Sequence, residues 1–170
     1  MLGRWPMRAL CATAVIAASC ALIGIVMVFG AAPAVAQATP AAISDAQDVN
    51  GVAGVVAEIV QCKRDSGVLS IRMRLRNTGD DQVNVSLIHL GNYDQYYFTA
   101  GSKKYFVLRD SEKTPLATQI NASDSSVVVT IAKGGSYVWY AKYPAPPDDQ
   151  KKINYYTPLT PPVEDIPIAD

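Results

Sequence analysis

Hydrophobic and polar residues alternate along several short stretches of the chain after residue 50. The clearest stretch is 68–76, where Leu69, Ile71 and Met73 are separated by polar or charged residues. A period of two places successive side chains on opposite faces of a strand, so the pattern predicts a strand with one apolar face. The opposite face carries three arginines, Arg72, Arg74 and Arg76.

A second alternating run, residues 82–87, follows the turn-like sequence of residues 77–81. Asn77 and Gly79 tolerate positive φ, and aspartate caps its own backbone, so this is a strong turn signal. The two runs are predicted to form a hairpin with a loop longer than two residues.

Other short runs of strand-forming residues continue to the end of the chain. The further predicted strands are 52–62, 96–99, 105–109, 127–131, 136–143 and 153–156, with a short edge segment at 166–168. Pro167 places that segment at an edge, because proline cannot donate to a ladder. Many short strands with Gly, Asn and Asp between them predict an all-β fold, a single antiparallel β-sandwich over residues 51–170.

The first 36 residues have the three parts of a secretory signal peptide. Arg4 and Arg8 lie in a short basic start, residues 9–29 are apolar, and a small-residue exit offers cleavage after Ala36 or Ala38. The alternative is an uncleaved membrane anchor, because roughly 20 apolar residues suffice to span a bilayer. Residues 37–50 show no period and are predicted to be a flexible leader.

Charge is divided unevenly between these parts. Residues 41–170 hold all fifteen acidic residues and thirteen of the fifteen basic ones, a formal net charge of −2. Nucleic-acid binding requires a clustered basic face, so a nucleic-acid partner is not expected.

Three segments late in the chain resemble a known group of domains. They are the sequence KKYFVLRD at 103–110, the proline-rich KYPAPP at 142–147, and PPVEDIPI at 161–168. Together they resemble small immunoglobulin-like domains of unassigned function in exported bacterial envelope proteins. Some of those domains precede an OmpA-like domain, which is not expected for this chain. The resemblance implies an immunoglobulin-like fold and an envelope location, and it implies no catalytic or ligand residues.

Residues for catalysis are scarce. His89 is the only histidine, and Cys62 is the only cysteine after residue 36. Neither has a motif that pairs a nucleophile with a base, so the chain is predicted not to be an enzyme and to carry no cofactor and no metal. Cys62 is expected to be a small buried residue, and the adjacent acid pairs, such as Asp80 and Asp81, to be solvated turn residues. Calcium held by loop carboxylates stays open as an alternative.

Aromatic residues supply the other binding candidates. Tyr93, Tyr96 and Tyr97 follow Gly91 in a predicted loop, where binding residues are often carried. The arginine face could meet an anionic wall polymer, or it could pair with acids on neighbouring strands.

The sequence therefore predicts a non-catalytic envelope module that binds a protein or a cell-wall component through loop aromatics, arginines or a strand edge. The alternative is a carbohydrate- or calcium-binding accessory protein. The expected location is the periplasm or the outside of the cell, with tethering to the inner membrane through residues 9–29 as the alternative.

Overall fold

The computed structural model describes residues 39–89, 91–118 and 126–170. The predicted signal segment, residues 1–36, and the apolar run 9–29 lie outside these residues. None of the helices in the described ranges is long and apolar enough to cross a membrane.

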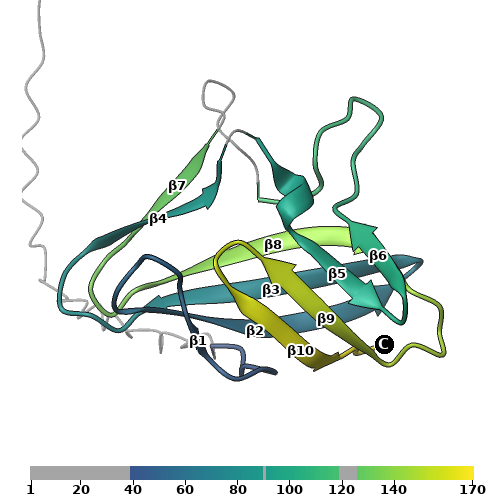
Figure 1. The fold of residues 1–170 in the computed structure, drawn as a ribbon, viewed down its shortest axis with the longest axis horizontal. Coiled ribbons are helices and arrows are strands. Elements are labelled where there is room, and N and C mark those ends of the chain that lie inside the picture. The colour runs from purple at the N-terminus through teal and green to yellow at the C-terminus, as the bar shows by residue number, and fades with distance from the viewer. Residues whose placement is uncertain (1–38, 90, 119–125) are drawn as a thin grey trace, which may run out of the picture. The chain divides into compact units, whose positions relative to one another are not determined.

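Antiparallel strand ladders make up the fold (Figure 1). The first sheet has the order β1-β2-β3-β8, the second has the order β10-β9-β5-β6, and β4 and β7 form a separate two-stranded ribbon. The strands are β1 (Gln47–Asp48), β2 (Val55–Asp65), β3 (Val68–Asn77), β4 (Val83–Ile88), β5 (Tyr97–Ala100), β6 (Lys103–Phe106), β7 (Val127–Ile131), β8 (Ser136–Pro144), β9 (Lys152–Thr157) and β10 (Thr160–Pro167). One short 3-10 helix, η1 (Tyr93–Gln95), precedes β5. The prediction of an all-β, antiparallel fold is confirmed.

One apolar core joins the sheets and the ribbon. In β3 the alternating residues Leu69, Ile71 and Leu75 are fully buried, as their period predicted. They share a single cluster with Trp139 of β8 and Phe98 of β5. Figure 1 shows β9 and β10 crossing in front of β2 and β3, which is how the second sheet covers this core.

The predicted hairpin between residues 68–76 and 82–87 is wrong. β3 pairs with β2 and β8, whereas β4 pairs with β7. The buried side chain of Asn77 fixes the bend between them: its Nδ2 donates to the carbonyls of Asp81 (2.7 Å) and Ile131 (3.1 Å), and its Oδ1 accepts from the Gly79 amide (3.0 Å). These bonds direct the chain out of the first sheet and into the ribbon. The turn-like sequence of residues 77–81 therefore forms a bend between two sheets and not the turn of a hairpin.

The predicted flexible leader also differs from the structure over residues 43–48. The Ile43 amide donates to the Ile59 carbonyl (2.7 Å), and the Ser44 hydroxyl accepts from the Ile59 amide (2.9 Å). β1 then pairs with β2. The leader is attached to the sheet through backbone hydrogen bonds. These bonds do not depend on the type of side chain, so the leader needs no apolar period.

The C-terminal segment links the two sheets. β10 pairs with β9, and Ala169 then exchanges hydrogen bonds with Cys62 and Arg64 of β2. Residues 166 and 167 of the predicted edge segment 166–168 are the end of this longer strand.

Candidate binding face

The outer face of the first sheet is formed by β2, β3 and β8. The registers of these strands bring their outward side chains into four rows across the sheet. We call this surface the basic face; its rows are Lys63–Ser70–Lys142, Gln61–Arg72–Tyr140, Glu58–Arg74–Val138 and Val56–Arg76–Ser136. Five of the twelve residues are basic and only Glu58 is acidic.

A β-bulge at Val60 brings Glu58 into this face. The pairing shifts by one residue between Ile59 and Gln61, which places Glu58 opposite Arg74 and Gln61 opposite Arg72. Without the bulge the strict period of two would send one of these residues inward.

Glu58 binds two of the three predicted arginines. Its Oε1 accepts from Nε of Arg74 (2.8 Å) and from Nε of Arg76 (2.8 Å), while Nη1 of Arg74 donates to the Pro40 carbonyl (2.9 Å). The side chains of Glu58 and Arg74 are only 8% and 10% exposed. Burial alone would raise the pKa of Glu58, but the hydrogen bonds and charges of the two arginines lower it. Of the two alternatives for the arginine face, Arg74 and Arg76 follow the one in which they pair with an acid on a neighbouring strand, here Glu58. The burial of Arg74 argues against its predicted role as a binding residue.

Arg72 is the arginine that stays available. Its side chain is exposed, and none of the ion pairs in the described part of the chain involves Arg72, Lys142 or Lys63. Arg72 lies opposite Tyr140, which is 42% exposed. A hollow of about 190 Å³ is lined by Gln61, Ser70, Ile71, Arg72, Tyr140, Ala141 and Lys142.

Two of the three predicted binding tyrosines lie in the core. Tyr93 is 2% exposed and Tyr96 is fully buried. The Tyr96 ring packs against Trp139 with 4.4 Å between ring centroids, and its hydroxyl donates to the Leu87 carbonyl. The Tyr93 hydroxyl donates to the Thr118 carbonyl (2.9 Å). The expectation that they form an exposed loop surface is wrong, because η1 turns both rings inward where their hydroxyls find backbone acceptors.

Tyr97 reaches the surface, but its ring already has partners within the protein. Tyr156 stacks on one face at 4.7 Å with an angle of 8° between the rings, and Nζ of Lys104 lies 4.5 Å from the ring centroid. The phenol is half-buried on the outer face of the second sheet.

The comparisons with known proteins match no family model, no curated protein and no solved structure.

The other candidate chemical groups are dispersed. His89 is exposed after β4, whereas Cys62 is buried, as predicted, and burial raises its thiol pKa to about 12. Across the described ranges there is no group of three or more His, Cys, Asp or Glu side chains placed to hold a metal ion. The turn acids Asp80 and Asp148 are more than nine-tenths exposed and each lies near one cation.

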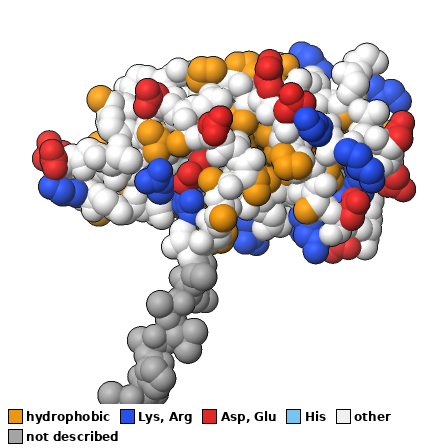
Figure 2. Space-filling model, turned by 90° about the horizontal axis from the view of Figure 1, so that it is seen from below, with side chains coloured by type: hydrophobic (Ala, Val, Ile, Leu, Met, Phe, Trp, Pro, Cys, Tyr) orange, Lys and Arg blue, Asp and Glu red, His pale blue; other side chains and the backbone are white. Residues whose placement is uncertain are grey.

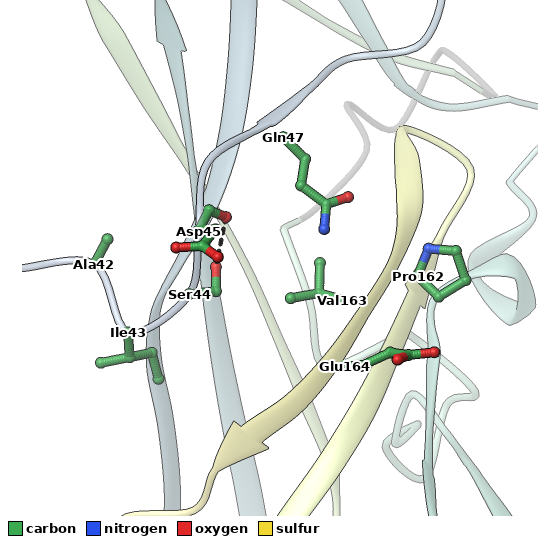
Figure 3. A pocket seen from close by; sticks show the side chains of 8 residues that line it. All are labelled: Ala42, Ile43, Ser44, Asp45, Gln47, Pro162, Val163 and Glu164. Atoms are coloured by element: carbon green, nitrogen blue, oxygen red, sulfur yellow. Dashed lines mark hydrogen bonds between the residues drawn. The ribbon is translucent and has the colours of Figure 1, made fainter.

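A second hollow lies between residues 42–47 and β10 (Figure 3). It is open, with a volume of about 590 Å³, and Gln47 extends its amide toward Pro162 and Val163. Figure 2, which looks at the molecule from below Figure 1, shows hydrophobic side chains gathered along the middle of this side among scattered charges of both signs. Its lining includes two acids, Asp45 and Glu164, but no cation and no aromatic ring, so this hollow does not suit an anionic ligand as the basic face does.

Sequence reasoning missed Tyr140, Lys142 and Lys63. Lys142 and Tyr140 alternate with buried residues in β8, so their outward direction could be read from the period of two. Their proximity to Arg72 could not, because it depends on the pairing of β3 with β8.

Proposed function

We propose that this protein is an exported, non-catalytic envelope protein whose single immunoglobulin-like β-sandwich binds an anionic polymer of the cell envelope. The proposed binding surface is the basic face, with Arg72, Lys142 and Tyr140 as its main contacts and Lys63 at its border. The export part of the proposal rests on the signal-like residues 1–36.

The observation that carries the proposal is the unpaired charge of the basic face. Residues 41–170 have a formal net charge of −2, yet five basic residues and one acid share this face. Glu58 is bonded to Arg74 and Arg76, and none of the ion pairs of the described residues involves Arg72, Lys142 or Lys63. Charge-assisted hydrogen bonds to phosphate or carboxylate are among the strongest that exposed cations make.

Tyr140 adds an apolar surface beside these cations. Its ring takes part in no aromatic or cation–π pair within the described residues, so its exposed side is free for a sugar ring. The hollow beside it, about 190 Å³, is smaller than the roughly 300–1,000 Å³ of small-molecule pockets. A polymer that lies across the sheet, with one repeat unit in the hollow, suits this shape better than an enclosed small molecule.

The test is polymer binding by the full chain, expressed with its own N-terminal segment. The purified protein is used whether or not that segment has been cleaved. The probe is purified lipopolysaccharide, compared with the same material after removal of its phosphates and with neutral dextran. We expect binding to the phosphorylated probe alone, weakened by added salt. In the double variant Arg72→Gln/Lys142→Gln we expect at least about a tenfold loss of affinity, since two charge-assisted contacts disappear.

The matched control is Lys103→Gln/Lys104→Gln, which removes the same number of cations from the second sheet. Equal losses in the two double variants would mean that only net charge matters and would overturn the proposed site. Mass spectrometry of the exported protein tests the other half of the proposal, since an intact segment 1–36 would indicate an anchored protein.

A further inference from the structure

β7 is an edge strand that lacks the usual protecting features among the described residues. Its five residues, Val-Val-Val-Thr-Ile, include no charge and no proline, and all of them are β-branched. One side of the strand pairs with β4. On its other side, the described residues provide no hydrogen-bonding strand, and Figure 1 shows β7 at the outer margin of the ribbon.

The other sheet edges in the described residues carry protecting features. β10 contains Pro161, Pro162 and Pro167 and two register shifts. β6 and β1 have four and two residues, and β6 begins with two lysines. Prolines, bulges, lysines and short length are the usual means by which proteins block strand addition at an edge.

β8 is protected in another way. The segment after β6 runs along its edge: the Leu108 amide donates to the Lys142 carbonyl (2.8 Å), and the Thr118 amide donates to the Tyr140 carbonyl (2.9 Å). β4 has a register shift between Ser86 and Ile88. Only β7, within the described ranges, is a regular and uncharged edge longer than four residues.

We propose that two copies of this chain associate by antiparallel pairing of β7 with β7 of the second copy. A two-fold axis through the middle residue, Val129, pairs all five positions. Val127 then lies opposite Ile131, on the face that each ribbon turns toward its own core, and Val128 lies opposite Thr130 on the outer face.

This pairing suits a second copy because the strand is self-complementary. The inward positions meet apolar residues, Val128 meets the uncharged, β-branched Thr130, and no like charges are brought together. Val128, which is 59% exposed in one chain, gains a neighbour. The result is a continuous four-stranded sheet, β4-β7-β7-β4. The proposed dimer is independent of the polymer-binding proposal, since the basic face lies on β2, β3 and β8.

The test is the molecular mass in solution of the protein expressed from the full chain, measured over a wide range of concentrations. We expect a concentration-dependent dimer. Val128→Lys should shift the protein to monomer, because a lysine on an edge opposes strand addition. Val128→Thr keeps a β-branched, uncharged residue and should leave the dimer intact. Val138→Lys, an equally drastic change at an exposed valine of β8, should do the same.

The register is tested by a disulfide. In a background with Cys11→Ser and Cys20→Ser, Val129→Cys should cross-link two chains on oxidation, because directly opposed Cα atoms lie about 4.5–5.5 Å apart. Val127→Cys should not, since it lies opposite residue 131. A monomer at every concentration, a dimer that Val128→Lys does not weaken, or cross-linking through residue 127 in place of 129 would each overturn the proposal.

Discussion

The outer faces of the two four-stranded sheets contain similar residue types and use them differently. On the second sheet, Lys104 lies over the ring of Tyr97, and Tyr97 stacks on Tyr156. On the first sheet, Arg72 and Tyr140 face each other across neighbouring strands, and neither has a partner of this kind in the described residues. A cation and an aromatic ring that contact each other within the protein are less available to a ligand. A cation and a ring without such a contact form a candidate binding surface.

Within the basic face, burial distinguishes a paired arginine from an available one. Arg74 is almost completely covered and is held by Glu58 and the Pro40 carbonyl, while Arg72, two residues earlier, is exposed. A charge that is removed from water needs a partner inside the protein. Arg74 is therefore a structural residue, and Arg72 is the one available for binding.

The largest effect is expected from Glu58→Gln. It removes the only carboxylate that compensates Arg74 and Arg76, so the free energy of unfolding should fall by about 2–3 kcal/mol, near the lower end for a broken buried pair, because Arg76 is partly exposed. Urea unfolding monitored by tryptophan fluorescence measures it. The control is Glu164→Gln on β10, an exposed acid that should cost less than about 0.5 kcal/mol. Equal losses in both variants would show that the pair is not structural.

The Glu58 carboxylate should also make the free energy of unfolding depend on pH in the acidic range. The pKa of Glu58 lies below its ordinary value of 4.5 in the folded chain, despite burial, because of its bonds to Arg74 and Arg76. Its contribution is therefore complete above pH 4.5 and is lost as the pH falls from there through the lowered pKa of the folded state. Unfolding curves across this range should fall more steeply for the wild-type chain than for Glu58→Gln, and parallel curves would contradict the assignment.

An alkaline loss of stability is expected from the buried phenols. Burial raises the pKa of Tyr155 to about 12, and its hydroxyl lies 3.1 Å from that of Tyr143, whose pKa is also raised. The unfolded chain releases these protons near pH 10.0 and the folded chain does not, so stability should fall as the pH rises from about 10 toward 12. Tyr155→Phe should flatten this decline, whereas Tyr140→Phe, at an exposed ring, should leave it unchanged.

Tyr97→Ala and Tyr140→Ala compare the two faces directly. Loss of the Tyr97 ring removes its stacking on Tyr156 and should cost about 1 kcal/mol of stability, with no effect on polymer binding. Loss of the Tyr140 ring should cost less stability and weaken polymer binding severalfold. The measurements are urea unfolding and binding to phosphorylated lipopolysaccharide, and the opposite pattern would move the binding surface to the second sheet.

The sequence predicted the features that depend on local alternation. The apolar face of β3 follows from residues that are neighbours along the chain. The β3–β4 bend was missed because the Asn77 side chain reaches the Ile131 carbonyl, 54 positions away. This long-range bond makes the turn-like sequence a bend between sheets and not a hairpin turn. A local sequence pattern gives no information about such a bond.

The candidate site was predicted in part for a similar reason. The spacing of Arg72, Arg74 and Arg76 correctly placed them on one face. Only the register with β2, shifted by the bulge at Val60, determines that Glu58 pairs with the second and third arginines and not with the first. Tyr93 and Tyr96 were misplaced because a connection rich in turn residues was taken to be exposed, whereas η1 folds it against Trp139.

The smallest effect, and the most direct test of the contrast between the faces, is the coupling of Lys104 to Tyr97. A cation over an exposed ring contributes roughly 0.5–1 kcal/mol, so Lys104→Ala should lower stability by about 0.5 kcal/mol in the wild-type chain and by much less in a Tyr97→Leu background. Unfolding of the four chains of this double-mutant cycle gives the coupling. A coupling near zero would mean that Lys104 leaves the ring uncovered, and Tyr97 would then have a free face for a sugar, as Tyr140 does. The carbohydrate-binding alternative would in that case apply to the second sheet as well.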